Sequence, residues 1–424
     1  MNVLIIGSGA REHALGWKIK QSPLLDKLFF LPGNPGTSEL GIHLPGTTED
    51  LKSIRDAIAA NRIGMVVVGP EMPLVNGIRD EIECDPRISH VKIIGPGREG
   101  AKLEGSKDFA KRFMQKYNIP TAPYASFTRE TLADGCRFLG SLKPPYVLKA
   151  DGPAAGKGVI IVHDQEEAER TLAEMTGGKF GKSSETVVVE KFLEGIELSV
   201  FILTDGNNYV MLPEAKDYKR VGVNDTGLNT GGMGSVSPVP FADGCFMEKV
   251  KNRIVKPTLT GLNAEGIRYT GFIFFGLINC NGDPYVIEYN VRMGDPETEA
   301  VMPRIKSDFL ALLDAAACET IGAHSLEIEH HPAATVMLVS GGYPGEFRKG
   351  FTISGCENVT DSILFHAGTK MDAGALTTNG GRVLAVTSTG GTPSEALKKC
   401  YNSVRLIDFE GKYFRPDIGF DLTR

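Results

Sequence analysis

The residues with the clearest chemical potential lie in one short stretch, EYNVRMGDPETEA, at positions 288–300. An apolar run precedes them, so they are expected to end a buried strand whose side chains alternate between two faces. Glu288 and Asn290 then share one face, and a carboxylate beside an amide oxygen suits a hard cation such as Mg²⁺. Arg292 on that face is suited to bind a carboxylate or phosphate through two parallel hydrogen bonds. The pattern predicts a cation and anion site at this strand end.

The alternative interpretation of this stretch is an exposed strand with a ladder of surface salt bridges. The companion run YTGFIFFGLI, residues 269–278, disfavours it because an exposed strand would not be so apolar. After the strand, GDPE at 294–297 predicts a rigid turn that presents Asp295 and Glu297 beside the same site.

A second chemical feature is the glycine-rich segment KADGPAAGKGVIIV at residues 149–162. It differs from a P-loop because only three residues separate Gly152 from Gly156, and Gly158 stands where that loop needs a magnesium-binding Ser or Thr. A flexible hairpin that folds over the phosphates of a nucleotide fits better, with Lys149 holding them from a strand. An exposed hairpin without a ligand is the alternative.

Two further segments carry polar groups beside apolar runs. In VVVEKFLEGIELSV, residues 187–200, acids flank an apolar slot that could take adenine through backbone groups near Lys191 and Phe192 and ribose hydroxyls through a carboxylate. Solvated acids at strand ends are the alternative there. The polar, glycine-rich segment 217–238 is expected to be a long loop whose NTGGMG core, residues 229–234, wraps a small polar substrate, with a disordered surface loop as the alternative.

The N-terminal segment GSGAREH, residues 7–13, follows the short strand VLII and resembles part of a dinucleotide-binding turn. Gly7 and Gly9 allow a tight turn that points helix N–H groups at a phosphate. Glu12 replaces the third glycine, and LPGNPG ends the second strand where an NAD enzyme needs an acid for the ribose. The loop therefore predicts a phosphorylated ligand other than NAD, with a purely structural turn as the alternative.

The elements needed to position these segments indicate several domains. Apolar runs at 65–69 and 91–95 each end at Gly followed by Pro, as parallel strands do at a ligand-facing edge, which predicts an α/β N-terminal domain with a parallel sheet. Ser106 is a candidate cap for the next helix, KDFAKRFMQKY. Hairpin-like spacing in the middle predicts antiparallel α+β structure, and strands with glycine-rich turns after residue 332 predict a small β-rich C-terminal domain.

Composition limits the partners of the chain. It has 424 residues, enough for about two to four domains, and its formal net charge of −6 offers no broad basic surface for nucleic acid or anionic membrane. Seven scattered cysteines predict neither a disulfide framework nor a zinc site, and no apolar stretch reaches membrane-spanning length. We expect a cytoplasmic protein with small anionic ligands and no nucleic-acid or membrane partner.

Taken together, the motifs resemble those of the phosphoribosylamine–glycine ligase (glycinamide ribonucleotide synthetase) family of the ATP-grasp superfamily. They cover nearly the whole chain in the order GSGAREHAL, GPEMPLVNGI, LEGSKDFAKRFM, KADGPAAGKGV, EKFLEGIELS, KDYKRVG, NTGGMG, EYNVRMGDPETEA, SGGYPG and FHAGTK followed by TNGGRVLAVT. The resemblance implies ATP-dependent ligation of glycine to 5-phosphoribosylamine through a glycyl phosphate, giving glycinamide ribonucleotide, ADP and phosphate in de novo purine biosynthesis. It also implies Mg²⁺ or Mn²⁺ as the metal, no protein nucleophile, and a monomer.

The resemblance further implies an α/β and α+β multidomain architecture. A parallel-sheet N-terminal (pre-ATP-grasp) domain at 1–103 would bind phosphoribosylamine. A two-lobed ATP-grasp region would follow at 104–330, with a mobile lid at about 122–192 that keeps water from the site. A small β-rich domain would occupy 331–424.

Carried over residue by residue, the resemblance assigns roles to matching positions. ATP would contact Lys107, Lys149, Gly156, Lys157, Gly158, Glu190, Lys191, Phe192 and Glu197. The metal ligands would be Glu288 and Asn290. The other substrates would contact Gly9, Arg11, Glu12, Glu71, Asn229, Gly231, Gly232 and Met233. The catalytic residues, which act on the reacting groups, would be Arg292, Asp295 and Lys219.

The sequence departs from the family pattern at three positions. Pro153 replaces an aliphatic residue in the lid loop, Tyr218 replaces a histidine, and Met293 replaces a leucine or phenylalanine. Pro153 could stiffen the lid, and Tyr218 argues against a general base at that position. The alternatives to the implied function are another ATP-grasp carboxylate–amine ligase or carboxylase, an NAD-dependent dehydrogenase, and a nucleotide sensor without catalysis.

Overall fold

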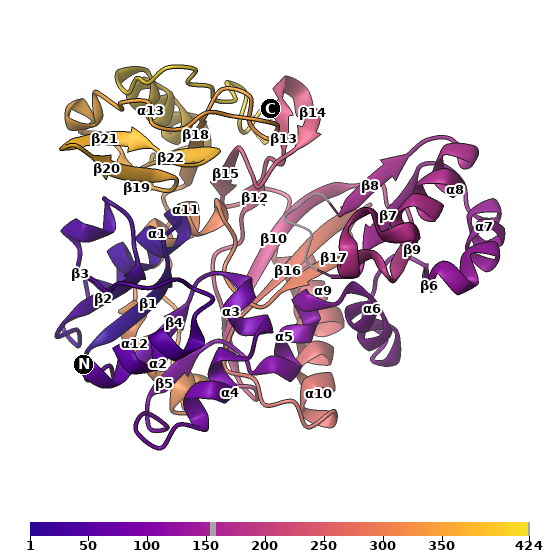
Figure 1. The fold of residues 1–424 in the computed structure, drawn as a ribbon, viewed down its shortest axis with the longest axis horizontal. Helices are drawn as coiled ribbons and strands as arrows, with labels where there is room; N and C mark the ends of the chain where they lie inside the picture. The colour runs from indigo at the N-terminus through magenta and orange to yellow at the C-terminus, as the bar shows by residue number, and fades with distance from the viewer. Residues whose placement is uncertain (153–157, 423–424) are drawn as a thin grey trace.

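The computed structural model describes residues 1–152 and 158–422. Figure 1 shows three lobes, with the N-terminal lobe at the lower left, the C-terminal lobe at the upper left and a lid that projects to the right. The central antiparallel strands β10, β16 and β17 run between these lobes. In the described part of the chain, no helix is long and apolar enough to cross a membrane.

The N-terminal lobe is built on a parallel five-stranded sheet of order β3-β2-β1-β4-β5, which confirms the predicted sheet. Its strands are β1 (Val3–Gly7), β2 (Leu28–Pro32), β3 (Ile42–His43), β4 (Met65–Val68) and β5 (Lys92–Ile94). Its helices are α1 (Ala10–Ile19), α2 (Leu51–Ala60), α3 (Glu71–Val75), α4 (Ile78–Glu83) and α5 (Arg98–Gly105). The strand order reverses between β1 and β4, and such a switch point opens a crevice at the carboxyl ends of the strands. The loops that start at Gly7 and at Gly69 both lie there.

The central sheet is antiparallel, as predicted, with the order β11-β10-β16-β17. Its strands are β10 (Ile196–Thr204), β11 (Tyr209–Met211), β16 (Gly271–Cys280) and β17 (Asp283–Asn290). The helices α9 (Gly244–Val250) and α10 (Lys256–Ala264) follow one another, and α9 packs against β17. Gly276 pairs with Glu288 while Leu277 pairs with Val286, so Ile287 is an extra residue in a β-bulge. The bulge leaves the Ile287 carbonyl available to a partner outside the sheet.

The lid is a four-stranded antiparallel sheet of order β6-β9-β7-β8. Its elements are β6 (Tyr124–Phe127), α7 (Leu132–Ser141), β7 (Tyr146–Ala150), β8 (Val159–Val162), α8 (Gln165–Glu174) and β9 (Val187–Lys191). The helix α6 (Lys107–Lys116) leads into it, and the Ser106 hydroxyl accepts from Phe109 N–H at 3.0 Å, which confirms the predicted cap. Phe127, Leu139 and Leu172 belong to a hydrophobic core separate from those of the other lobes.

The C-terminal lobe has a five-stranded sheet of order β12-β15-β18-β22-β19, and two of its strands come from the middle of the chain. The sheet contains β12 (Lys216–Asp217), β15 (Gly234–Ser237), β18 (Ala333–Val339), β19 (Ile363–His366) and β22 (Arg382–Thr389). The hairpins β13 (Arg220–Gly222) with β14 (Thr226–Asn229) and β20 (Thr369–Asp372) with β21 (Ala375–Thr378), and the helix α13 (Pro393–Leu406), complete it.

The prediction of a continuous loop at 217–238 was therefore wrong. The segment holds β13, β14 and β15 and the end of β12. These strands are short and rich in glycine and polar residues, so their sequence lacks the apolar alternation that marks a strand. Pairing of β15 with the buried strand β18 supplies the stability that local sequence does not.

Candidate active site

The first part of the site is the turn between β1 and α1. Glu12 stands there in place of the third glycine of a dinucleotide-binding turn, and its side chain fills the space that a glycine would leave open. Glu12 is 2% exposed, and its carboxylate accepts from Gly9 N–H at 2.6 Å and from Arg11 Nε at 2.7 Å. A Cβ at Gly69, at the end of β4, would lie 2.0 Å from Glu12 Oε1. The loop after β4 can therefore lie this close to Glu12 only with glycine at position 69. Because Gly9 N–H already pairs with Glu12, a phosphate could take that donor only by displacing this carboxylate.

Two arginines converge on one backbone carbonyl beside this turn. Arg11 donates to the Met293 carbonyl at 3.3 Å, and Arg292 donates to the same oxygen at 3.1 Å. Arg292 also pairs with Glu104 at 2.9 Å, and its Nε lies 3.9 Å from a Glu71 oxygen. The other Glu104 oxygen accepts from the backbone N–H of residue 291 at 2.8 Å. The turn after β17 is thereby tied to the N-terminal lobe.

The pKa values of these groups reflect burial and mutual attraction. Burial opposes the charge of Arg11, but Glu12 and Asp295 outweigh it and raise the pKa of the guanidinium. Burial raises the pKa of Glu104 despite the attraction of Arg292. For Glu71 the attraction of Arg292 prevails over burial and lowers the pKa. Sequence analysis did not single out Glu104, although it lies in the quoted motif LEGSK.

A carboxyl cluster, formed by Asp217, Asp295, Glu297 and Glu299, lies around Arg382 of β22. Arg382 pairs with Asp295 Oδ1 at 3.0 Å, donates to the Asp295 carbonyl at 2.8 Å, and also donates to the Gly231 carbonyl. Three motifs far apart in sequence, NTGGMG, RMGDPE and NGGRV, thus meet at one side chain. Sequence analysis did not predict Arg382, because a lone arginine after two glycines gives no sign of such distant partners.

The carboxyl cluster is crowded at Gly232. Its φ is +112°, and a Cβ there would lie 2.3 Å from Pro296 Cδ and 2.7 Å from Asp217 Oδ1. Only glycine accepts both that backbone conformation and that proximity. Gly232 therefore brings the NTGGMG segment against Asp217, whose role sequence analysis also missed although KDYKRVG was noted.

Several acids of the carboxyl cluster are poorly paired. In residues 1–152 and 158–422, neither oxygen of Glu299 nor Asp217 Oδ1 has a hydrogen-bond partner, while Glu297 accepts from the Ser199 hydroxyl at 2.8 Å. Burial, then Asp295, raises the pKa of Glu299, which is 0% exposed. Burial, then Glu297, raises the pKa of Asp217. Both carboxyls therefore favour their neutral form more than an ordinary acid does.

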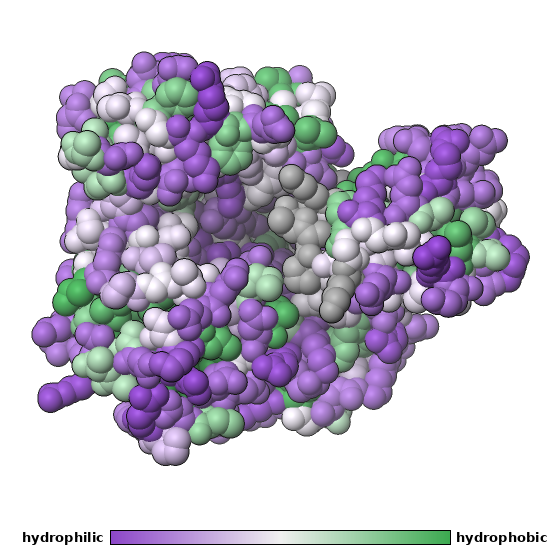
Figure 2. Space-filling view, viewed as in Figure 1, coloured by the Kyte–Doolittle hydropathy of each residue, from purple (hydrophilic) through white to green (hydrophobic). Residues whose placement is uncertain are grey.

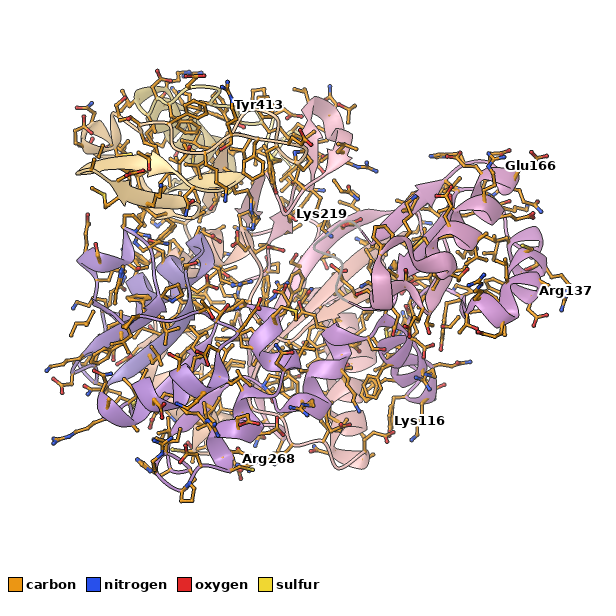
Figure 3. The ribbon with its side chains drawn as sticks, in the orientation of Figure 1. Lys116, Arg137, Glu166, Lys219, Arg268 and Tyr413 are labelled. Atoms are coloured by element: carbon orange, nitrogen blue, oxygen red, sulfur yellow. The ribbon has the colours of Figure 1, made fainter. Side chains whose placement is uncertain are left out.

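Lys219 lies between the C-terminal lobe and the lid in the view of Figure 3. Its Nζ is 3.2 Å from Glu197 Oε2 and 3.9 Å from Glu288 Oε1. Glu197 is the main cause of its raised pKa. For Glu288, burial alone would raise the pKa, but four surrounding cations lower it: Lys219, Lys149, Lys107 and Arg292. An ionised Glu288 and the amide of Asn290 two residues along β17 are oxygen donors that fit a hard divalent cation.

A lysine cluster, formed by Lys107, Lys111, Lys149 and Glu190, lies where the lid meets the central sheet. Lys111 Nζ is 2.9 Å from Glu190 Oε2, and Lys149 Nζ is 3.0 Å from Glu190 Oε1. The second contact pairs the charges but is not aligned as a hydrogen bond; instead Lys149 donates to the bulged carbonyl of Ile287 at 3.2 Å. Sequence analysis predicted Lys107, Lys149 and Glu190 as neighbours of one nucleotide and missed Lys111, which lies one helical turn after Lys107.

The other predicted site residues lie in varied surroundings. Lys191 and Asn229 are exposed, and Phe192 is half-buried. Met233 is 0% exposed within the hydrophobic core, so only its backbone could meet a ligand. The Gly158 carbonyl accepts from Ala150 N–H at 2.8 Å, and Gly156 and Lys157 lie outside the described residues.

The three residues that depart from the family pattern lie in different parts of the chain. Tyr218 is buried and donates to Asp421 at 2.7 Å, and Arg415 lies 5.3 Å from the centre of its ring. Met293 is buried in the core shared by the N- and C-terminal lobes. Pro153 lies outside the described residues. Tyr218 thus points into the C-terminal lobe, away from Lys219 and Glu288.

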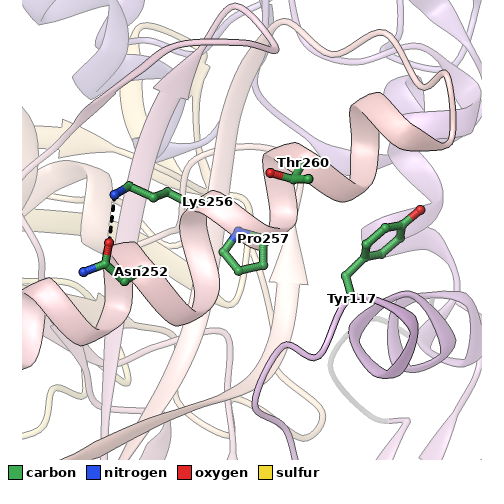
Figure 4. A pocket seen from close by; sticks show the side chains of 5 residues that line it. All are labelled: Tyr117, Asn252, Lys256, Pro257 and Thr260. Atoms are coloured by element: carbon green, nitrogen blue, oxygen red, sulfur yellow. Dashed lines mark hydrogen bonds between the residues drawn. The ribbon is translucent and has the colours of Figure 1, made fainter.

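Figure 2 shows a hydrophilic hollow between the three lobes, on the face where Figure 3 places Lys219. A different recess lies between the end of α6 and α10, and its lining is Tyr117, Asn252, Lys256, Pro257 and Thr260 (Figure 4). It contains neither of the two clusters, and its only charged side chain, Lys256, donates to Asn252 at 2.8 Å. This recess therefore offers none of the paired carboxylates and lysines described above.

A parallel-sheet lobe, a central antiparallel sheet and a four-stranded lid that meets it over buried lysines define the ATP-grasp class of enzyme. The sequence matches three family profiles that describe phosphoribosylglycinamide synthetase: its N domain at residues 1–104, its ATP-grasp (A) domain at 105–298 and its C domain at 333–421. The chain belongs to the phosphoribosylglycinamide synthetase family, and it is a ligase of the ATP-grasp class.

Individual relatives agree with this assignment. A phosphoribosylamine–glycine ligase of Chlorobaculum tepidum is 43% identical over 427 aligned positions, which cover 99% of each chain. The crystal structure of phosphoribosylamine–glycine ligase from Thermotoga maritima has a TM-score of 0.86 and 37% identity, and the match covers 98% of this chain and 100% of that one. The biotin carboxylase domain of 2-oxoglutarate carboxylase from Hydrogenobacter thermophilus has a TM-score of 0.71 over 97% of this chain and 91% of that one, but at 17% identity it shares the fold alone.

Proposed function

We propose that the chain ligates glycine to 5-phosphoribosylamine with ATP, giving glycinamide ribonucleotide, ADP and phosphate in purine biosynthesis. The observation that carries the proposal is the group of four cations around Glu288, supplied by α6, the lid strand β7, the segment between β12 and β13, and the turn after β17. Transfer of a phosphoryl group gathers negative charge in one place, and fixed cations in a site closed to water stabilise it. Full-length similarity to relatives named phosphoribosylamine–glycine ligase supports the choice of substrates.

The proposed reaction has two steps, and neither needs a protein nucleophile. An oxygen of the glycine carboxylate attacks the terminal phosphorus of ATP, the bond to ADP breaks, and glycyl phosphate forms. The amine nitrogen of phosphoribosylamine then attacks the acyl carbon, the carbon–oxygen bond to phosphate breaks, and the nitrogen loses a proton. Lys107 and Lys149 would hold the ATP phosphates, and Lys219, Arg292 and Asp295 would orient the reacting groups.

Glu288 and Asn290 are the proposed metal ligands. Mg²⁺ or Mn²⁺ bound there would neutralise phosphate charge, and two protein ligands are usual for Mg²⁺ beside a phosphate substrate. The remaining contacts to adenosine would come from Glu190, Lys191, Phe192 and Glu197, and the lid segments at Gly156, Lys157 and Gly158 would cover the phosphates. Phosphoribosylamine would lie between the N-terminal turn and the NTGGMG segment, near Gly9, Arg11, Glu12, Glu71, Asn229, Gly231, Gly232 and Met233.

Further proposals concern the organisation of the chain. The domains would span 1–103, 104–330 and 331–424, and a lid at about 122–192 would close to protect the acyl phosphate from water. A separate hydrophobic core in the lid supports such independent movement. A reducing, cytoplasmic location is supported by seven free cysteines, and the absence of nucleic-acid and membrane partners is supported by the net charge of −6. We also propose a monomer.

The test is the release of ADP by the purified protein with MgATP and phosphoribosylamine generated in place, with and without glycine, while mass spectrometry detects the product. The proposal predicts glycine-dependent ADP release and an equal amount of glycinamide ribonucleotide. ADP release that depends on bicarbonate instead would indicate the carboxylase alternative. Bound ATP without glycine-dependent turnover would indicate a nucleotide sensor and would contradict the proposed ligation.

A further inference from the structure

Lys111 is a buried cation to which the proposed reaction assigns no role. Its side chain is 2% exposed and lies on α6, four residues after Lys107. Its Nζ is 2.9 Å from Glu190 Oε2 on β9 and donates to the Thr121 hydroxyl at 2.7 Å. Thr121 in turn donates to the carbonyl of Val286 on β17 at 2.7 Å. Lys111 therefore joins a lid strand to the central sheet.

The charges around Lys111 do not balance. Lys111 and Lys149 share one carboxylate, that of Glu190, and all three side chains are at least 94% buried. The ring of Tyr124 lies 5.7 Å from Lys111 Nζ and offers only a weak further interaction. An unpaired buried charge is costly, and the two lysines outnumber the one carboxylate that pairs with both of them. Lys149 also lies near Lys107 and Glu288, so it is placed to meet an anion.

The geometry shows which lysine would meet that anion. Lys111 pairs with Glu190 and donates to Thr121, whereas Lys149 pairs with Glu190 and donates to the Ile287 carbonyl, next to Glu288 in the chain. Burial, partly offset by Glu190, lowers the pKa of Lys111 to about 8, as expected for a cation held in a poorly solvated position. The two lysines together outweigh burial and keep the pKa of Glu190 low.

We propose that Lys111 is a positioning residue for ATP: it neutralises Glu190 so that Lys149 is free to bind the nucleotide phosphates. Without Lys111, Glu190 would have Lys149 as its only close partner, and the charge that Lys149 offers to a phosphate would be neutralised. The inference rests on the proposed function only in that ATP is the nucleotide. It predicts that the loss of Lys111 weakens binding more for nucleotides that carry more phosphates.

The experiment measures the dissociation constants of adenosine, MgADP and MgATP by calorimetry for wild type, Lys111→Met and Lys111→Arg. We expect Lys111→Met to weaken MgADP and MgATP at least tenfold more than adenosine, and Lys111→Arg to restore most of the loss. Lys116→Met is the matched control, because Lys116 lies on the same helix with its side chain 62% exposed and pairs with Glu265 outside the cluster. It should leave all three constants within twofold of wild type.

Equal weakening of adenosine and MgATP would overturn the proposal, because it would show that Lys111 only shapes the pocket. Unchanged binding of MgATP would overturn it as well. If Lys111→Met does not fold, the double variant Lys111→Met/Glu190→Gln removes both charges. The proposal then predicts that the ratio of the MgATP to the adenosine dissociation constant stays within about threefold of the wild-type ratio, and a tenfold change in that ratio would overturn it. Since glycine and phosphoribosylamine are absent from these measurements, a failure of the proposed ligation leaves the result for Lys111 intact.

Discussion

In the lysine cluster two cations share one carboxylate, whereas in the carboxyl cluster three acids, Asp217, Asp295 and Glu299, lie near one arginine. The two regions lie on either side of Lys219 and Glu288, so the site changes from a surplus of positive groups to a surplus of acids within one hollow. The first suits a polyphosphate. The second is acidic, and its partly exposed carboxylate, Asp295, could accept a hydrogen bond from an amine. The difference teaches that local charge within the hollow can differ strongly from the net charge of −6 of the whole chain.

The largest effect is expected at the boundary between the clusters. Glu288→Ala should lower the rate of glycine-dependent ADP release about 1,000-fold, because it removes a proposed metal ligand and the carboxylate that four cations face. Circular dichroism and Tm should remain close to wild type. Turnover near the wild-type rate in magnesium would contradict the assignment of Glu288 as a metal ligand.

A second substitution tests whether the two clusters act separately. Arg382→Met should lower kcat/KM for the ligation about 100-fold, since Arg382 positions Asp295 and the Gly231 backbone. MgADP affinity, which depends on the lysine cluster, should stay within twofold.

Arg348→Met is the control for Arg382, because Arg348 is an arginine of the same lobe whose side chain is 82% exposed and lies 3.5 Å from Glu410. It should leave both measurements unchanged. A large loss of MgADP affinity in Arg382→Met would mean that the clusters are not independent.

A third prediction concerns the pH dependence of stability. The pKa of Glu299 is raised in the folded state, so the folded protein holds this proton more tightly than the unfolded chain, and stability is lost as pH rises from the unfolded pKa through the folded one. Glu299→Gln keeps the size of a protonated glutamate and cannot ionise, so it removes this loss of stability at high pH. Its Tm should match wild type near pH 4 and exceed it by about 1–2 °C near pH 8. If the difference in Tm between Glu299→Gln and wild type does not change with pH, burial does not raise the pKa of Glu299.

The smallest effect is expected away from both clusters. Tyr218→Phe removes the hydrogen bond to Asp421 and should lower the free energy of unfolding by about 1–2 kcal/mol. The rate of ligation should stay within twofold, because the hydroxyl points into the C-terminal lobe. A 100-fold loss of turnover at unchanged stability would restore a proton-transfer role to this position.

The sequence was informative where chemistry sits at the end of an apolar strand. Lys149 and Glu288 were singled out in that way and remain predicted site residues, whereas the parallel and antiparallel sheets, predicted from the spacing of apolar runs and glycine turns, are confirmed. Arg382 and Glu104 were missed because their partners lie more than 60 and 180 residues away in the chain, at Asp295 and Arg292. Short strands within 217–238 were missed because pairing, and not their own composition, makes them strands: β15 pairs with β18 and β12, and β13 pairs with β14.

The shared sheet of the C-terminal lobe has a consequence for how the polypeptide could be divided. Since β15 pairs with β18, a cut near residue 331 would separate neighbours in one sheet and leave a row of backbone donors and acceptors on β18 open to other chains. The isolated C-terminal fragment would therefore tend to aggregate or to recruit a foreign strand. Fragment complementation should succeed at a lid boundary more readily than at this one, because the lid keeps all four of its strands to itself.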